Sequence, residues 1–258
     1  MHTVAVILVR AGSKGLPDKC VLPLCGRPVL SYTIGHAQQS RYVDEIILST
    51  DSARAAAIGR AAGLFLVQRP PELASDTANA QDATRHAVTT YEEATGLRVD
   101  TVVVLGGNIP IRAEGIIDQC VDRLVSTGCD SVQTVAAVGK FHPDWMYRLD
   151  DGRMQQYRPN NIVRRQDLEQ LYLLDGAVVV ARRERLMDPA GQANPTAYLG
   201  DYGEAVVHED CVDIDTLTDF YVAEAVLRVR SEAVIADFPT AGTRRRACTA
   251  AIGLRQRS

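Results

Sequence analysis

The sequence predicts an α/β protein with a doubly wound, mostly parallel sheet, and three observations support this class. Short apolar runs alternate with segments of helical periodicity along the first half of the chain. Two of these runs, TVAVILV at residues 3–9 and TVVVL at residues 101–105, are almost continuously apolar, which is typical of strands covered on both faces. Hydrophobic residues make up 46% of the 258 residues, enough for a large packed core.

The expected elements follow one another in the order strand, helix, strand. Strands are predicted at residues 3–9, 45–50, 64–67, 99–105 and 131–138, and helices at residues 28–40, 52–62, 81–95 and 114–126. In a sheet of this kind, ligands bind at the carboxyl ends of the strands. We therefore expect chemistry directly after the first strand.

The composition changes from about residue 140 to residue 175. This segment contains the single Trp and several Tyr, with turn signals at DDG and RPNN, and it predicts an inserted lobe. The parallel α/β pattern is expected to resume at residues 176–186 and to end in a helix at residues 215–229. Residues 237–258 are basic and lack an apolar face, so a flexible tail is expected there.

Charge and cysteine usage exclude several classes of function. The formal net charge of −4 favours neither nucleic acid nor an anionic membrane as a partner. The six cysteines show no metal-finger spacing, which indicates reduced thiols without disulfides. Because no signal-peptide pattern and no membrane-spanning apolar stretch is found, a cytoplasmic location is expected.

The segment VRAGSKGLPDK, residues 9–19, follows the first predicted strand and combines two glycines with three basic residues. Backbone N–H groups of a glycine-rich turn can surround phosphate oxygens, while Arg10, Lys14 and Lys19 neutralise their charge. Neither the P-loop motif nor the dinucleotide-binding glycine fingerprint is present. A glycine turn with solvated basic residues is the alternative interpretation of this stretch alone.

Five blocks in the same order resemble the CMP-sugar synthetases, the acylneuraminate cytidylyltransferases and their relatives, which couple CTP to an acidic sugar. The blocks are RAGSKGLPDK with the following Leu-Pro-Leu and Gly-x-Pro, IILSTDS at residues 46–52, QRPPELASDTANAQDATRHA at 68–87, IPIR at 109–112 and VDIDTLTDF at 212–220. The resemblance covers residues 4–229. It implies a Rossmann-like fold of the nucleotide-diphospho-sugar transferase type, with one catalytic domain over residues 1–236 and a dimerisation lobe inserted at about 140–175.

The resemblance also implies which residues bind CTP. Arg10, Lys14 and Lys19 would be the catalytic cations that hold the triphosphate. The remaining nucleotide-binding positions would be Ala11, Gly12, Ser13, Gly15, Arg69, Ala78, Asn79 and Ala80. For Arg69 a surface salt bridge is the alternative. The chain departs from the family at Ala80, where a serine is usual, and at Cys20, where an asparagine is common.

Asp213 and Asp215 lie two residues apart on a segment expected to be extended. Their carboxylates would therefore point to one face and could share Mg²⁺ (or Mn²⁺) that bridges nucleotide and sugar. As an alternative, Asp215 could cap the last helix.

On the acceptor side, the resemblance implies contacts from Gly106, Asn108, Arg112, Arg165 and Asp175. Gly106 stands where the sialic acid enzymes have a sugar-contacting glutamine, and Asp175 stands where they have an asparagine. Arg165 matches the arginine that pairs with the acceptor carboxylate, although a solvated Arg164/Arg165 pair is the alternative. His142 matches a family histidine, and a structural role is expected for it.

The predicted activity is a Mg²⁺-dependent transfer of CMP from CTP to an acidic acceptor, a nonulosonate (sialic-acid-like) sugar, with release of pyrophosphate. A phosphonate or another acidic acceptor remains an alternative, as does a nucleotide-binding module without catalysis. The aromatic residues of the lobe, among them Trp145 and Tyr147, and the resemblance predict a homodimer in which Arg165 serves an active site at or near the interface.

Overall fold

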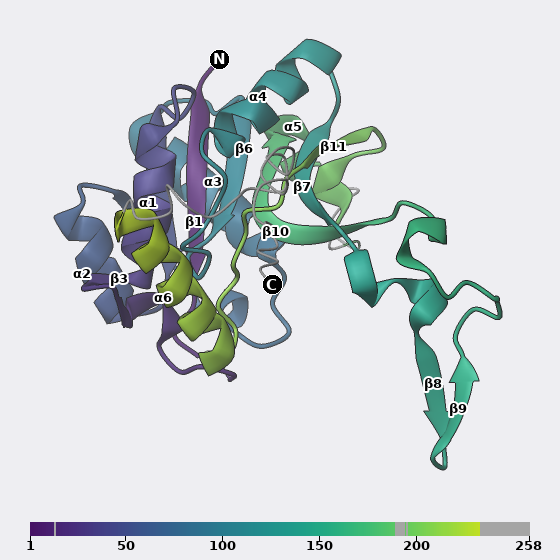
Figure 1. The fold of residues 1–258 in the computed structure, drawn as a ribbon. Coiled ribbons are helices and arrows are strands. Elements are labelled where there is room, and N and C mark those ends of the chain that lie inside the picture. Colours follow the sequence, from purple (N-terminus) through teal and green to yellow (C-terminus); the bar gives the residue numbers. More distant parts are fainter. Residues whose placement is uncertain (13, 189–193, 195, 233–258) are drawn as a thin grey trace, which may run out of the picture.

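A seven-stranded sheet forms the centre of the computed structural model, which describes residues 1–12, 14–188, 194 and 196–232 (Figure 1). The strand order is β11-β7-β10-β6-β1-β4-β5, and every pairing except those of β10 is parallel. The strands are β1 (Thr3–Val9), β4 (Glu45–Thr50), β5 (Phe65–Gln68), β6 (Thr101–Gly106), β7 (Ser131–Ala137), β10 (Tyr172–Arg182) and β11 (Gly203–Val207). This confirms the predicted doubly wound, mostly parallel class.

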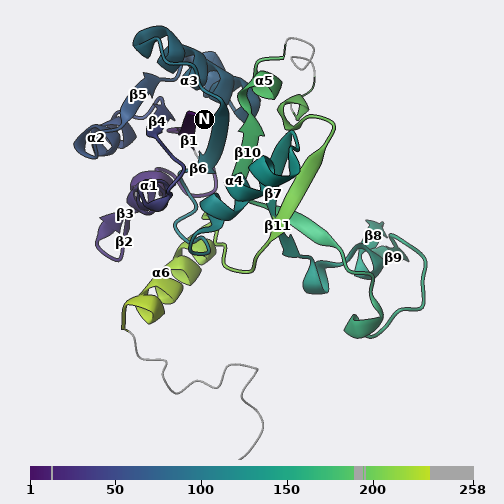
Figure 2. The same cartoon turned by 90° about the horizontal axis from the view of Figure 1, so that it is seen from above.

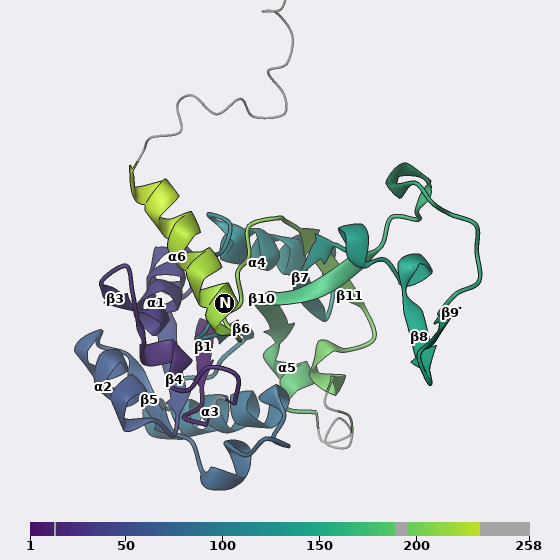
Figure 3. The same ribbon diagram turned by 60° about the horizontal axis from the view of Figure 1, so that its bottom comes forward.

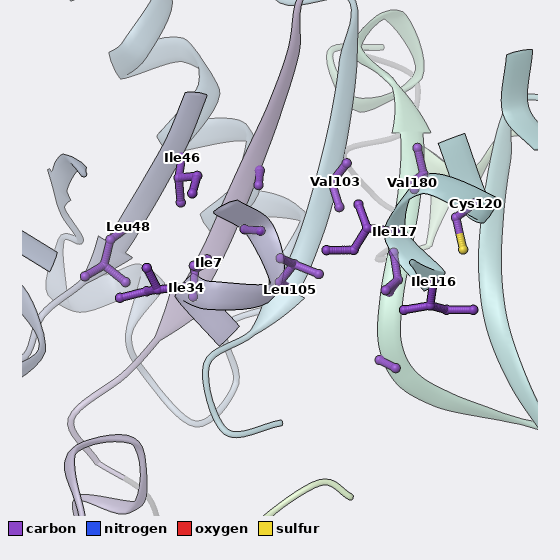
Figure 4. Close-up of a cluster of buried hydrophobic side chains, with 14 of the residues drawn as sticks. Ile7, Ile34, Ile46, Leu48, Val103, Leu105, Ile116, Ile117, Cys120 and Val180 are labelled. Atoms are coloured by element: carbon purple, nitrogen blue, oxygen red, sulfur yellow. The ribbon is translucent and has the colours of Figure 1, made fainter. Parts of the chain in front are cut away.

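Helices cover both faces of the sheet, as the apolar runs predicted (Figure 2). They are α1 (Val29–Gln39), α2 (Ala53–Ala61), α3 (Ala80–Thr95), α4 (Ile116–Thr127), α5 (Arg183–Leu186) and α6 (Leu217–Glu232). Helices α1, α2 and α4 pack on one face, against side chains such as Ile7 and Leu105 (Figure 4). Helices α3 and α5 pack on the other face, against Val6 and Val104.

Strand β10 corrects the expected parallel continuation after the lobe, because it is antiparallel to both of its neighbours, β6 and β7. A parallel neighbour needs a crossover that returns the chain to the amino edge of the sheet. Here the chain enters β10 from the lobe, which already lies at the carboxyl edge, so the strand runs the opposite way. Its register shifts between Leu174 and Val179, next to Gly176 with a φ of 69°.

The segment between β7 and β10 projects away from the sheet as a separate lobe (Figures 1 and 3). It contains the hairpin of β8 (Tyr147–Asp150) and β9 (Arg153–Gln156), whose turn residues Asp151 and Gly152 both have positive φ values, as the DDG signal predicted. Trp145 supports the lobe from within, since its indole Nε1 donates to the carbonyl of Ile162 at 2.9 Å. His142 is buried and bonded to the carbonyl of Glu169, which agrees with a structural role.

Two short strands, β2 (Pro23–Leu24) and β3 (Arg27–Pro28), form a small hairpin between β1 and α1. The predicted tail at residues 237–258 lies outside the described residues. Within the described residues, no helix is both long enough and apolar enough to cross a membrane. Five cysteines in this part of the chain are free thiols: Cys20, Cys25, Cys120, Cys129 and Cys211.

Candidate active site

A cleft of about 590 Å³ opens at the carboxyl edge of the sheet, where the chemistry was expected. Segments from five parts of the chain form its walls: the loop after β1, the end of β5, the start of α3, the end of β6 and the segment before α6. Eleven of the predicted site residues line it: Arg10, Lys14, Gly15, Lys19, Arg69, Ala78, Asn79, Ala80, Gly106, Asn108 and Asp215. The tertiary structure therefore brings most of the predicted nucleotide-binding set into one space.

The three basic residues of the first loop each contact a carboxylate in this cleft. Lys19, whose side chain is only 15% exposed, places Nζ 2.5 Å from Oδ1 of Asp215. Arg10 Nη1 lies 2.8 Å from one oxygen of Asp76, and Lys14 Nζ lies 2.7 Å from the other. The cations are thus held in the cleft by acidic side chains that a bound polyphosphate could replace.

The two glycines of the first loop have different surroundings. A Cβ on Gly15 would lie 2.4 Å from the backbone oxygen of Asp215, whereas a Cβ on Gly12 would meet no atom within 4 Å. Gly15 therefore allows the first loop to approach the segment that carries the acidic pair. The N–H of Ala11 donates to Oδ1 of Asp51 at 2.8 Å, which ties the loop to the end of β4. Ser13 lies outside the described residues.

The acidic pair has the arrangement that the extended segment predicted. Ile214, between the two aspartates, is fully buried, so both carboxylates lie on the opposite, accessible side. Asp213 accepts a hydrogen bond from the amide of Asn108. Desolvation by the surrounding protein, followed by the charge of Asp215, raises the pKa of Asp213 to about 6, although its surface remains accessible.

Asp215 does not cap the last helix in this structure. Thr216 and Asp219 form the cap instead: the N–H of Asp219 donates to the Thr216 hydroxyl at 3.3 Å, and the N–H of Thr216 donates to Oδ2 of Asp219 at 2.7 Å. The carboxylate of Asp215 instead contacts Lys19, and Asp215 lines the cleft.

The residues at the acidic pair fit a divalent cation. The charge of Asp215 disfavours the ionisation of Asp213, and the two carboxyl groups supply the hard oxygen ligands that Mg²⁺ prefers. Within the described part of the chain, no cluster of three or more acidic, His or Cys side chains could hold a metal by itself. A cation held by two carboxylates would complete its shell with phosphate oxygens and water, as Mg²⁺ usually does.

Arg69 and the start of α3 also border the cleft. Arg69 is 5% exposed and donates from Nη2 to the carbonyl of Ser49 at 2.7 Å and from Nε to the Ser49 hydroxyl at 3.1 Å, so it is not the surface salt bridge of the alternative interpretation. Asn79 caps α3 by accepting from the N–H of Asp82 at 2.7 Å. The first turn of this 16-residue helix thus borders the cleft with its positive dipole end.

The predicted acceptor residues are placed in three different ways. Gly106 and Asn108 line the cleft. Arg112 and Asp175 do not line it. Arg112 is 2% exposed. The carboxylate of Asp175 accepts a hydrogen bond from the hydroxyl of Thr134 at 2.6 Å and lies 2.7 Å from Nε2 of His208. Arg165 is an exposed residue of the lobe, separate from its neighbour Arg164, which pairs with Asp167.

Sequence reasoning missed several residues of the cleft: Leu8, Val9, Leu73, Ser75, Asp76, Ala83 and Thr216. Asp76 is the most consequential of these, because it pairs with two of the three predicted phosphate ligands. Asp76 lies in the motif block at residues 68–87, but an acidic residue is not expected at an anion site. Cys20 also lines the cleft, and burial raises its pKa to about 12, so its thiol is protonated at neutral pH.

Two solved structures have a fold similar to that of this chain. CMP:2-keto-3-deoxy-manno-octonic acid synthetase, solved in complex with CTP, matches with a TM-score of 0.65 and 17% identity over 89% of this chain and 100% of that chain. The 4-diphosphocytidyl-2C-methyl-D-erythritol synthase of Anaerococcus prevotii matches with a TM-score of 0.57 and 17% identity, covering 88% of this chain and 99% of that one. At these identities the likeness supports the fold alone.

Sequence comparison is more specific. An N-acylneuraminate cytidylyltransferase of Streptococcus agalactiae is 30% identical over 224 residues, which cover 85% of this chain but 52% of the relative, so the chain spans about half the length of that relative. The CMP-N,N'-diacetyllegionaminic acid synthase of Legionella pneumophila is 28% identical over 247 residues, covering 91% of this chain and all of the relative. The family model described as cytidylyltransferase matches residues 4–184. The chain belongs to the cytidylyltransferase family.

Proposed function

We propose that the protein transfers CMP from CTP to an acidic acceptor, a nonulosonate sugar, and releases pyrophosphate. One observation carries the proposal: the cleft places Arg10, Lys14 and Lys19 of the first loop opposite the carboxylate of Asp215. The acceptor class is supported by the names of its relatives, which include an N-acylneuraminate cytidylyltransferase and a legionaminic acid synthase.

The proposed chemistry is a displacement at phosphorus. A hydroxyl oxygen of the acceptor forms a bond to the α-phosphorus of CTP and gives its proton to water. The bond from the α-phosphorus to the bridging oxygen breaks, and pyrophosphate leaves with the electron pair. Arg10, Lys14 and Lys19 would neutralise the triphosphate, which otherwise repels an anionic acceptor. Arg69 and the first turn of α3 would bind the nucleoside end of CTP.

Asp213 and Asp215 would hold Mg²⁺ or Mn²⁺. The bound cation would neutralise phosphate charge and polarise the reacting oxygens. Lys19 pairs with Asp215, and the amide of Asn108 donates to Asp213. Asn108 also donates to the carbonyl of Ile214 at 3.3 Å, which keeps the acidic pair next to the end of β6.

We also propose a two-fold homodimer formed through the lobe. Several of its apolar side chains are exposed in the single chain: Phe141 (68%), Leu149 (73%), Met154 (65%) and Val163 (84%). Arg165 lies in the lobe and does not line the cleft of its own chain, so pairing of lobes would let it serve an active site at or near the interface. A cytoplasmic location is proposed with it, supported by the free thiols of the described residues.

Pyrophosphate release with purified protein tests the function. CTP, ATP, GTP and UTP are each offered with Mg²⁺ and with a panel of acidic α-keto sugars and phosphonates. We expect turnover with CTP and a nonulosonate, and greater thermal stabilisation by CTP than by the other nucleotides. Turnover with a phosphonate alone would move the assignment to that acceptor class. Equal stabilisation by all four nucleotides, or full activity in a chelator, would refute the proposal.

A further inference from the structure

Arg112 is a fully buried guanidinium in which every hydrogen-bond partner is uncharged. Nε donates to the carbonyl of Ala177 at 2.7 Å, Nη2 to the carbonyl of Gly106 at 3.0 Å, and Nη1 to the carbonyl of Ile109 at 2.5 Å. Nη1 also donates to the Thr33 hydroxyl at 3.0 Å. Burial lowers the pKa of Arg112 to about 10, so the group is still charged at neutral pH.

These contacts join three segments that are distant in sequence. Gly106 is the last residue of β6 and Ile109 lies just beyond it, so the two bound a turn at residues 106–109. Ala177 belongs to β10, and Thr33 belongs to α1. The Thr33 hydroxyl lies 3.2 Å from the carbonyl of Gly106 and 3.1 Å from that of Ile109, so it supports the same turn. The guanidinium of Arg112 therefore bonds the turn, β10 and α1 together, and the hydroxyl of Thr33 adds a second link between the turn and α1.

One of the segments held by Arg112, the 106–109 turn, forms part of the wall of the cleft. The turn carries Gly106 and Asn108, which line the cleft, and Asn108 contacts Asp213. The N–H of Ile214, between the two aspartates, donates to the carbonyl of Asn108 at 3.0 Å. The turn is therefore also bonded to the segment that carries the acidic pair. On β10, Ala177 follows Gly176, where a Cβ would lie 3.9 Å from Cδ1 of Ile109.

We propose that Arg112 is a positioning residue for the acceptor: it aligns the 106–109 turn with β10 and so sets the acceptor pocket without touching the acceptor. The expected effect of Arg112 on turnover with the acceptor rests on the proposed function. Its expected effect on the position of the 106–109 turn does not. It replaces the direct contact expected from the sequence, because the guanidinium is 2% exposed and its donors are used internally.

Arg182 lies on β10, the strand that Arg112 contacts through Ala177, and provides a matched control. Arg182, at the far end of β10, donates from Nε to the carbonyl of Cys129 at 2.8 Å. It pairs in register with Thr101, the first residue of β6, at the sheet edge opposite the cleft. Arg182→Lys therefore removes a similar bond from the same strand without reaching the acceptor side.

The kinetic test compares Arg112→Lys with Arg182→Lys in the full chain, with the KM values of CTP and acceptor measured separately. For Arg112→Lys, kcat/KM for the acceptor should fall by about tenfold or more, as expected when a reacting group is misplaced, while KM for CTP stays within about twofold. Arg182→Lys should leave both values at the wild-type level. An equal fall of kcat/KM for the acceptor and for CTP, or no fall of kcat/KM for either substrate, would overturn the proposal.

A second measurement needs no substrate and so separates this proposal from the proposed function. Amide hydrogen exchange over residues 106–112 and 176–178 should accelerate by about tenfold or more in Arg112→Lys, but not in Arg182→Lys. If Arg112→Lys does not fold, Thr33→Val serves instead: it keeps the shape of the side chain, removes the hydroxyl, and should give a smaller change of the same kind. Unchanged amide exchange in these segments would refute the positioning role of Arg112, even if the enzyme is active. Accelerated exchange in a protein that is inactive with every acceptor would refute only the proposed transfer of CMP.

Discussion

Lys19 Nζ lies 2.5 Å from Oδ1 of Asp215, although 196 positions separate the two residues in the chain. The contact joins the first loop, which supplies positive charge, to the acidic pair, which supplies negative charge. A triphosphate with a divalent cation has the complementary pattern, because its oxygens suit Lys19 and its cation suits Asp215. Lys19 and Asp215, which contact each other here, are thus the same two groups that would bind phosphate and cation in the proposed substrate complex.

Removing either charge of this pair should impair turnover more than binding. Lys19→Ala is expected to lower kcat by about 10²-fold or more, since a fixed charge facing the transition state is lost, and Arg10→Ala should behave similarly. Asp215→Asn and Asp213→Asn should abolish turnover while the far-ultraviolet circular dichroism stays unchanged. Arg60→Ala, an exposed cation on α2, is the control. A change in KM alone would show that Lys19 binds substrate and transition state alike.

Gly15 and Gly12 form a matched pair for testing the loop. Gly15→Ala would place a Cβ 2.4 Å from the backbone oxygen of Asp215, so the loop or the acidic segment must move. We expect a loss of kcat/KM of about tenfold or more, because small displacements of catalytic groups are costly. Gly12→Ala has free space around the new methyl group and should leave the stability of the ligand-free protein unchanged. Equal thermal stability of the two ligand-free variants would contradict the observed packing.

Asp76 should oppose the binding of phosphates, because its two oxygens pair with Arg10 at 2.8 Å and Lys14 at 2.7 Å. Asp76→Asn is expected to tighten the binding of inorganic pyrophosphate by about 3–10-fold at low salt, an effect that weakens as salt screens these exposed charges. Isothermal titration at two salt concentrations measures it. Glu72→Gln, on the same loop, should change little. Weaker pyrophosphate binding by Asp76→Asn would mean that this carboxylate supports the ligand instead.

The lobe should carry the dimer contact on its exposed apolar residues. Leu149 and Met154 face each other across the β8–β9 hairpin and are 73% and 65% exposed. Changing both to Glu should convert the dimer into a monomer in sedimentation at micromolar concentration and lower activity in parallel. Val125→Glu, 55% exposed on α4, is the control. Trp145 is a poorer probe than the sequence indicated, because its indole stabilises the lobe. Wild-type protein that is fully active as a monomer would refute the dimer.

His36 should make the stability depend on pH. Burial, followed by the charges of Arg112 and Arg230, lowers the pKa of His36 from 6.5 to about 4. The unfolded chain therefore binds a proton at a higher pH than the folded protein does. The stabilisation is complete above pH 6.5 and is lost progressively as the pH falls towards 4, by at most about 3 kcal/mol.

Urea unfolding of the wild type and of His36→Gln between pH 4 and pH 8 measures this dependence. The glutamine can still accept a hydrogen bond from Arg112, which His36 Nδ1 does at 3.4 Å, but it does not titrate. The wild type should lose stability relative to the variant as the pH falls. Parallel curves would show that the pKa of His36 is the same in the folded protein as in the unfolded chain.

Much of the fold follows from patterns that are local in the sequence. The predicted helix at 81–95 is α3 (Ala80–Thr95), and the strand at 3–9 is β1, because apolar periodicity acts over a few neighbouring residues. Strand β11 (Gly203–Val207) was missed, since its alternating pattern at the edge of the sheet gives a weak apolar signal. The direction of β10 was wrong for a different reason: it depends on where the preceding lobe delivers the chain.

The sequence by itself determined the family, the mostly parallel sheet and the position of the phosphate-binding loop, because these depend on short motifs and on residue order. Only the tertiary structure decided how each charged side chain is used. Arg10 and Arg112 are the same residue type in recognisable motifs, yet one borders the cleft and the other is 2% exposed among backbone carbonyls. Burial and the choice of partner depend on contacts between segments up to 196 positions apart, and these arise only when the chain folds.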